Sequence, residues 1–496
     1  MKKVIVIGAG LGGLASGIRL LKAGYQVDIY EKNDFPGGKI HQIAQEGFLF
    51  PIGPCAISSP QQFQELFSLG EADINEVLAL QKPSPMYEVF FSANPSASFS
   101  AYSDLPSLIE QVEQITPGQS KGFLTFLGKG QENLSLTKAL FATKPFSHWK
   151  QFFHMKTLAF SIRAGGFSSS RKYMGKTITD TKLIDALSFF SLFEGPAGAK
   201  SPSWQALKPT MDFLLGSWQV QGGLNALVHG LEQLFVYLGG TLHYRTPVDK
   251  ILIENQKAYG VQIGNQLALS DHVLCNADFP YALKHLIKSP QTKGSYTDEK
   301  IDSLAYSPSA LIIGLGMKKP YPLIKTDRYF ISRNMARNAE QLYNGQLIDD
   351  PSFLLSPAFS TLHGSSSFQE SLCVMVPVSN LRVSTYGWEE ETITYYKKRV
   401  LETLQKVKGF EDIQEQVDRF FYFTPLDFQS KFNAYNGACF GLLPLSNQSY
   451  FRKPQNVLPT CEGLYFIGSS IHPGPGIPFV LQGAKNAVEA LIEKDR

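Results

Sequence analysis

The sequence predicts an α/β protein in which a discontinuous Rossmann-like domain is interrupted by a mixed α+β domain and a helical segment. Three observations lead to this prediction. Residues 4–30 follow the order strand, glycine turn, helix and strand, as in a βαβ unit. Residues 462–492 return to strand, glycine loop and helix. The residues between these ends lack that order, so we expect the two ends of the chain to meet in one domain.

Composition excludes several classes of protein. The 496 residues are 43% hydrophobic, which is ordinary for a globular protein, and 46 basic against 43 acidic residues leave a net charge of +3. This balance gives no reason to expect a nucleic-acid partner. The five cysteines are scattered and form no C-x-x-C pair, so neither a metal site nor a disulfide framework is expected, and a reducing cytoplasm fits best.

No apolar run reaches the length of about 18 residues that a transmembrane helix needs. A secretion signal is an alternative interpretation of Lys2 and Lys3 before the apolar residues 4–7. That run is too short for a signal peptide, and Arg19 and Lys22 interrupt the residues that follow. We therefore expect a cytoplasmic protein, and nothing in the sequence indicates its oligomeric state.

The first strand and helix carry a nucleotide-binding pattern. Gly8, Gly10 and Gly13 follow the first apolar strand, and Glu31 follows the second. The first glycine permits a tight turn, the second lets the backbone approach a pyrophosphate, and the third lets helix and strand pack closely. The helix N-terminus favours phosphate, and the carboxylate can accept hydrogen bonds from ribose hydroxyls. An ordinary βαβ unit without a ligand is the alternative interpretation.

Two further stretches favour a flavin over a nicotinamide. The stretch FPGGKI places two glycines and a cation, Lys39, after the second strand. Near the other end of the chain, Gly468 follows a strand, and a helix begins at Pro478. In flavoprotein oxidoreductases, a C-terminal strand, glycine and helix return to the first βαβ unit and bind the flavin end of FAD. The helix N-terminus there can stabilise negative charge on the reduced ring.

These motifs belong to a pattern that runs nearly end to end. It comprises VIGAGLGGLASGIRLLKAGYQVDIYEKNDFPGGK, GFLFPIGP (47–54), QGGLNALVHGLEQL with TPVDKI (within 221–251), NADFP (276–280), FTPLDFQSKFNAYNGACFGLLPLSNQSYFRKPQN (423–456) and GLYFIGSSIHPGPGIP (463–478). The last two stretches are the most specific. On these residues the chain resembles the bacterial carotenoid desaturases, the phytoene desaturase and dehydrosqualene desaturase group of FAD-dependent oxidoreductases. The C-terminal stretch is most similar to the thirty-carbon, staphyloxanthin-type branch.

The resemblance implies FAD as the cofactor and gives roles to individual residues. The first glycine loop would hold the pyrophosphate, Glu31 the adenosine ribose, and Val248 the adenine through its backbone. Lys39 would lie near the phosphates, and the residues from Gly468 onward would border the isoalloxazine. The cofactor-binding residues implied in this way are Gly8, Gly10, Leu11, Gly12, Gly13, Glu31, Gly37, Gly38, Lys39, Val248, Gly468, Ser469, Pro475, Gly476, Ile477 and Pro478.

The chain departs from the family pattern at four places. The family usually has Arg where Lys39 stands, so the charge is kept but a bidentate fork is lost. Pro51 replaces an Asp that normally follows the Phe. Residues 325–332 replace a histidine-bearing stretch, and residues 360–371 replace an Asp-bearing one. Most of these departures concern the substrate and the reaction rather than the cofactor.

The resemblance implies desaturation of a long-chain isoprenoid polyene in carotenoid biosynthesis, for example dehydrosqualene (diapophytoene) to diaponeurosporene. A lipid-soluble substrate of this kind needs an apolar and aromatic tunnel, and residues 187–202 match the family's substrate-side stretch. Three alternatives stay open. They are an oxygenase of the same family that acts on terminal methyl groups, a soluble flavin amine oxidase, and a lipid-binding protein that keeps the fold without catalysis.

The sequence does not identify a general base. His472 is the candidate catalytic residue, although an orienting hydrogen bond is an equal interpretation of a histidine in a loop of prolines and glycines. Glu194 lies in the substrate-side stretch, where a charged residue usually marks a solvated rim. Cys439 is interpreted as a small packed residue rather than a nucleophile.

Because the expected substrate is lipid-soluble and no span is predicted, we expect peripheral attachment to the inner face of the cell membrane. Residues 144–156, KPFSHWKQFFHMK, have the aromatic and basic character of an interfacial segment, and an ordinary solvated helix is the alternative.

We expect three parts in the chain. They are an FAD-binding domain (1–100, 216–290 and 436–496), a helical segment contacting substrate and membrane (101–215) and a substrate domain (291–435).

Overall fold

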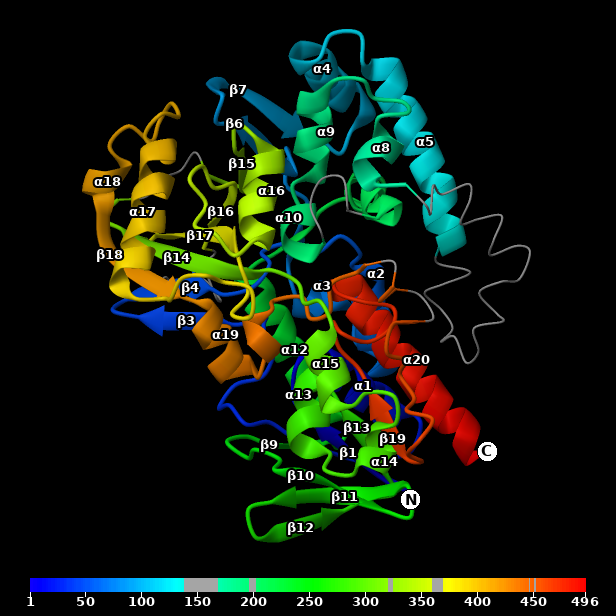
Figure 1. The fold of residues 1–496 in the computed structure, drawn as a ribbon. Coiled ribbons are helices and arrows are strands. Elements are labelled where there is room, and N and C mark those ends of the chain that lie inside the picture. Colours follow the sequence, from blue (N-terminus) through cyan, green and yellow to red (C-terminus); the bar gives the residue numbers. More distant parts are fainter. Residues whose placement is uncertain (138–167, 196–201, 320–323, 359–368, 446, 450–451) are drawn as a thin grey trace.

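A computed structural model describes residues 1–137, 168–195, 202–319, 324–358, 369–445, 447–449 and 452–496 (Figure 1). The predicted interfacial segment 144–156 lies outside the described residues. So do residues 196–201 of the substrate-side stretch and most of the departure at 360–371. Within the described part of the chain, no helix is both long enough and apolar enough to cross a bilayer.

A five-stranded parallel sheet joins segments that are far apart in the sequence. Its strand order is β19-β13-β1-β2-β9, and every neighbouring pair is parallel. The C-terminal strand therefore lies in the same sheet as the first strand, as the sequence predicted. The strands are β1 (Lys3–Ile7), β2 (Gln26–Tyr30), β9 (Thr241–His243), β13 (His272–Cys275) and β19 (Leu464–Phe466).

Alternate residues of β1 pack on opposite faces of this sheet, because side chains of a strand point to its two faces in turn. Val4 and Val6 face a layer of helices, whereas Ile5 and Ile7 face a layer built around an antiparallel meander. The helical layer contains α1 (Leu11–Lys22), α2 (Gln61–Leu69), α3 (Ile74–Val77), α12 (Gly223–Tyr237) and α20 (Ile477–Asp495). The other layer contains β10 (Lys250–Glu254), β11 (Lys257–Ile263), β12 (Gln266–Leu269), α13 (Phe279–Tyr281) and α15 (Asp298–Ser303).

A seven-stranded sheet forms the upper half of the molecule in Figure 1. Its order is β18-β14-β17-β16-β15-β6-β7, and it is antiparallel apart from the parallel pair β15 and β6. The strands are β6 (Tyr87–Phe91), β7 (Asn94–Ala101), β14 (Ser309–Met317), β15 (Asp327–Ile331), β16 (Phe353–Pro357), β17 (Ser371–Val378) and β18 (Val417–Phe423). Residues 87–101 thus belong to this sheet and not to the parallel one.

Two glycines of β14 make room for a hairpin that packs across the sheet. The hairpin consists of β3 (Gln42–Gln45) and β4 (Phe48–Pro51). A Cβ on Gly314 would lie 2.4 Å from the ring of Phe50, and one on Gly316 would lie 2.8 Å from the ring of Phe48. Glycine inside a strand commonly marks such a close approach. This contact seats the loop that follows the first βαβ unit on the second sheet.

Short helices pack against the seven-stranded sheet in a shared core. One of them spans residues 105–115, and the Asp104 side chain accepts a hydrogen bond from the Ser107 N–H at its start. The α-helices among the described residues of 101–215 are α4 (Leu105–Ile115), α5 (Ser120–Thr137), α8 (Ser170–Met174), α9 (Thr181–Ser188), α10 (Ser191–Glu194) and α11 (Leu207–Leu215). Later in the chain come α16 (Met335–Tyr343), α17 (Glu390–Leu404), α18 (Ile413–Gln416) and α19 (Pro425–Phe432).

Candidate active site

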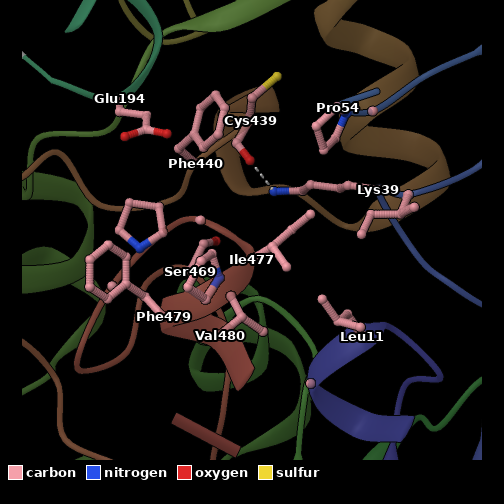
Figure 2. Close-up of a pocket in the computed structure, with 18 of the residues that line it drawn as sticks. Leu11, Lys39, Pro54, Glu194, Cys439, Phe440, Ser469, Ile477, Phe479 and Val480 are labelled. Atoms are coloured by element: carbon pink, nitrogen blue, oxygen red, sulfur yellow. Dashed lines mark hydrogen bonds between the residues drawn. The ribbon is translucent and has the colours of Figure 1, made fainter. Parts of the chain in front are cut away.

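A cavity of about 1170 Å³ is bordered by both halves of the molecule. Its lower wall comes from the loop between β1 and α1 and from the start of α20, and its upper wall comes from α8, α10 and α11. In Figure 2, Glu194 and Phe440 lie on one side of the cavity, and Leu11 and Val480 lie on the other. Pockets for one small ligand are usually about 300–1,000 Å³, so this cavity has room for a cofactor and part of a second ligand.

The first glycine loop forms part of the cavity wall, as the sequence predicted. Gly8, Gly10, Leu11 and Gly12 line the cavity, whereas Gly13 does not. A Cβ on Gly13 would lie only 2.1 Å from the Gly8 carbonyl oxygen, so this glycine allows α1 to pack closely on the loop. Gly10 has φ −67° and ψ 173°, a conformation open to any residue, so glycine at this position provides space and not conformational freedom.

The Glu31 carboxylate fixes the glycine loop to the end of β2. One oxygen accepts a hydrogen bond from the Ala9 N–H at 2.8 Å, and the other accepts from the Asn33 N–H at 2.9 Å. Burial raises the pKa of Glu31, and these N–H donors oppose that rise. The Asn33 side-chain amide also donates to the oxygen that accepts from the Asn33 N–H, at 3.0 Å. The oxygen that accepts from Ala9 can take a second hydrogen bond, so the side chain can hold the loop and still receive a ribose hydroxyl.

The second glycine loop lies directly against the first. The Gly37 N–H donates to the Ala9 carbonyl at 2.9 Å, and both Gly37 and Gly38 line the cavity. The Lys39 ammonium donates to the carbonyl oxygen of Cys439 at 2.7 Å and to that of Ala438 at 3.3 Å (Figure 2). Sequence reasoning placed this ammonium near phosphates. In the structure the Lys39 ammonium donates hydrogen bonds to backbone carbonyls of a segment 400 residues away.

The loop before α20 supplies the other predicted cofactor residues. Gly468, Ser469, Pro475, Gly476, Ile477 and Pro478 all line the cavity. Gly468 has φ +140°, which favours glycine, and a Cβ on it would meet no atom within 4 Å. Gly468 therefore leaves open space for a ligand to approach the backbone. Val248, on the opposite layer of the parallel sheet, is buried and also lines the cavity.

Two long helices begin at the cavity. Within the described residues, neither Gly10 at the start of α1 nor Gly476 at the start of α20 provides a side-chain cap for the first turn. Uncapped N–H groups and the helix dipole leave partial positive charge at such an end, which favours an anion. The cavity therefore has two places that suit negative charge, and both were predicted from the glycine patterns.

A buried charged cluster forms the far wall of the cavity. The Lys208 ammonium lies 4.0 Å from a Glu194 carboxylate oxygen and 4.3 Å from the centre of the Phe190 ring. The Asp212 carboxylate accepts a hydrogen bond from the Ser58 hydroxyl at 2.8 Å. Burial raises the pKa of both Glu194 and Asp212, and the Lys208 charge opposes that rise. Sequence reasoning singled out Glu194, but missed Lys208 and Asp212, which carry no motif.

His472 and Cys439 both line the cavity. His472 is buried. Its backbone N–H donates to the Pro454 carbonyl at 2.8 Å, and this bond ties the loop before α20 to a neighbouring segment. Burial raises the pKa of the Cys439 thiol to about 11. Such a thiol is protonated at neutral pH, which agrees with its interpretation as a packed residue rather than a nucleophile.

A family model described as flavin-containing amine oxidoreductase matches residues 11–492. The chain belongs to this family. The chain is also similar to proteins named 4,4'-diapophytoene desaturase (4,4'-diaponeurosporene-forming). One, of Staphylococcus haemolyticus, is 29% identical over 99% of this chain and 98% of that protein. Another, of Staphylococcus aureus strain MRSA252, is 28% identical over 99% of both chains. The family and these relatives agree with the resemblance stated from the motifs.

Two solved structures superpose on nearly the whole of this chain. A putrescine oxidase triple mutant has a TM-score of 0.64 at 14% identity and covers 99% of each chain. A fatty acid isomerase from P. acnes has a TM-score of 0.59 at 15% identity and covers 99% of this chain and 98% of its own. At such low identity these structures establish the fold alone, a mixed α/β fold.

The family establishes FAD as the cofactor and the chain as an FAD-dependent oxidoreductase. The shape and charge of the cavity also fit this cofactor. Gly10 and Gly468 leave space where side chains would intrude, two uncapped helix ends suit negatively charged groups, and the Glu31 carboxylate lies beside the first loop. Bound FAD supplies a ring that accepts a hydride.

Proposed function

We propose that this enzyme desaturates a thirty-carbon isoprenoid polyene, converting dehydrosqualene (diapophytoene) to diaponeurosporene or a related product. The observation that carries the proposal is the similarity over the full length of both chains to desaturases of that name. The cavity supports it, because part of its wall is apolar and aromatic, with Met174, Leu187, Phe190, Phe193 and Phe440. Such a wall holds a hydrocarbon and excludes water.

We propose that FAD extends from the first glycine loop to the loop before α20. The loop residues Gly8 to Gly12 would contact the pyrophosphate, with Gly13 keeping the helix close. Glu31 would receive the ribose and Val248 the adenine. Gly37, Gly38 and Lys39 would form the part of the cavity wall beside the first glycine loop. The stretch from Gly468 and Ser469 to Pro475, Gly476, Ile477 and Pro478 would border the flavin ring. The positions of these residues around one cavity support the assignment.

Each new double bond requires the loss of a hydride and of a proton from adjacent carbons. We propose that Glu194 accepts the proton, because it lines the cavity, is charged beside Lys208, and has a pKa raised by burial, which makes it a stronger base than an exposed carboxylate. His472 lies in the loop before α20, and its backbone N–H donates to the Pro454 carbonyl, a bond that holds the loop and does not involve the imidazole. The Lys208 charge keeps the proton acceptor ionised between turnovers.

Co-expression with a dehydrosqualene synthase tests the reaction. Cells that make colourless dehydrosqualene are expected to turn yellow or orange when this chain is added, and the extracted pigment is expected to be a hydrocarbon with a longer conjugated system. Recovery of a terminal aldehyde or acid from added diaponeurosporene, with dehydrosqualene unchanged, would instead identify an oxygenase. Oxidation of a polyamine with neither carotenoid changed would identify an amine oxidase.

We further propose peripheral attachment to the inner face of the cell membrane through the helical segment 101–215. A lipid-soluble substrate requires access from the bilayer, and Leu105, Leu124 and Leu214 are 50%, 42% and 41% exposed on helices of this segment. The purified protein is expected to float with liposomes of anionic and neutral lipid. Leu124→Ser with Leu214→Ser is expected to reduce the floating fraction.

A matched control for flotation is available at the other end of the molecule. Leu267 and Leu269 are 61% and 59% exposed on β12, which lies far from α5 in Figure 1. Leu267→Ser with Leu269→Ser is expected to leave flotation unchanged. A wild-type protein that stays in the soluble fraction with both kinds of liposome contradicts membrane attachment.

A further inference from the structure

Lys453 is a buried lysine in the cavity wall. Only 5% of its surface is exposed, and it is one of the residues that line the cavity. Its ammonium nitrogen lies 3.1 Å from the position that a Cβ on Gly474 would take. Gly474 belongs to the loop immediately before α20, so the lysine charge lies beside the end of the cavity where that helix begins.

The Lys453 ammonium has no counter-ion among the described residues. These residues include every Asp and Glu of the chain, and none forms an ion pair with it. Burial lowers its pKa to about 8, and no neighbouring charge opposes this shift. Lys208 differs in this respect, because its charge is balanced by Glu194 and Asp212.

A buried cation without a protein partner lowers the free energy of unfolding, because the charge loses its hydration. An apolar side chain of the same length would fill the same space without this desolvation penalty. Its position in a cofactor cavity gives it a partner when the bound group is negatively charged. FAD brings negative charge in two places, the pyrophosphate and, after two-electron reduction with uptake of one proton, the flavin ring. The glycine loop at the start of α1 already suits the pyrophosphate, and Lys453 lies beside the other loop.

We propose that Lys453 is the counter-ion for the negatively charged reduced flavin. It acts together with the N-terminus of α20, and it favours reduction of the ring by balancing the charge that reduction adds. The proposal rests on FAD as the cofactor and does not depend on which hydrocarbon is oxidised. It gives a role to a residue that lies in the stretch 423–456 but was given no role from the sequence.

The two-electron midpoint potential of the FAD-loaded, full-length protein tests the proposal without any substrate. In Lys453→Met, the reduced state is expected to be destabilised about tenfold relative to the oxidised state, which lowers the potential by about 30 mV. Lys453→Arg keeps the charge and is expected to retain most of the wild-type potential. Lys431→Met removes a charge from an exposed residue that lines the cavity beside Asn33, and is expected to leave the potential unchanged because water screens it.

Two further readouts separate this role from others. Lys453→Met is expected to keep its FAD and to melt at or above the wild-type temperature, because an uncompensated buried charge has been removed. An unchanged potential in Lys453→Met overturns the proposal. Loss of FAD with an unchanged potential in the remaining bound fraction also overturns it and identifies a phosphate ligand. If Lys453→Met does not fold, Lys453→Gln gives the same comparison with a neutral polar side chain.

Discussion

Replacing Gly10 with valine (Gly10→Val) is expected to give a folded protein that purifies without FAD. The Gly10 backbone accepts any residue, and the nearest atom to a new Cβ is the flexible Asn276 side chain at 2.7 Å, so the fold tolerates the change. The added methyl groups would occupy the space that the pyrophosphate needs. Flavin absorbance per mole of purified protein is expected to fall by at least about tenfold, with the circular dichroism spectrum kept.

Gly128→Ala is the matched control for this variant. Gly128 lies on the exposed side of α5, and a Cβ there would meet no atom within 4 Å. This variant is expected to keep its FAD and to gain about 0.5–1 kcal/mol in free energy of unfolding, because alanine favours helix. A Gly10→Val protein with the full flavin absorbance would show that the pyrophosphate does not lie at the first glycine loop.

Lys208→Met is expected to lower the free energy of unfolding by about 3 kcal/mol, measured by urea titration at pH 7. The substitution leaves the buried carboxylates of Glu194 and Asp212 without a cation. Removing one partner of a buried ion pair typically costs about 3–5 kcal/mol. We expect the lower end of that range, because 32% of the Lys208 side chain is exposed where it faces the cavity, and water there screens part of the charge.

The effect of Lys208→Met should depend on pH with a definite sign. Burial raises the pKa of Glu194 and Asp212 above their unfolded values, and the Lys208 charge opposes that rise. Without Lys208 both pKa values are expected to rise further, so the folded variant takes up protons at a higher pH than the folded wild type and loses the penalty of unpaired charge. The difference in stability between variant and wild type is therefore expected to shrink from pH 7 toward pH 5. Lys398→Met, which breaks an exposed pair with Glu402, is expected to change stability by less than about 0.5 kcal/mol at either pH. A Lys208→Met protein as stable as Lys398→Met would contradict a buried charged cluster.

The sequence by itself determined the two glycine loops that border the cavity. Gly8, Gly10 and Gly13 stand at fixed short spacings after a buried strand, and the same holds for Gly468 before the last helix. Such patterns encode their own geometry, because a tight turn, a close backbone approach and a helix start each depend on only a few neighbouring residues. The structure places Gly8, Gly10 and Gly468 around one cavity, as predicted.

The partners of charged groups were decided by the tertiary structure. The ammonium of Lys39, which lines the cavity, donates to the carbonyl of Cys439, 400 residues away, and no local pattern predicts this partner. Asp212 lies in none of the stretches that carry the resemblance, and Lys453 lies in one that gave it no role. Whether each charge is paired or left alone depends on the elements that pack around it. The need for glycine in β14 was also decided by the tertiary structure, because the rings of Phe48 and Phe50 on the distant β4 pack against Gly316 and Gly314. Burial and pairing are set by segments far apart in the chain, so no local pattern of residues could specify them.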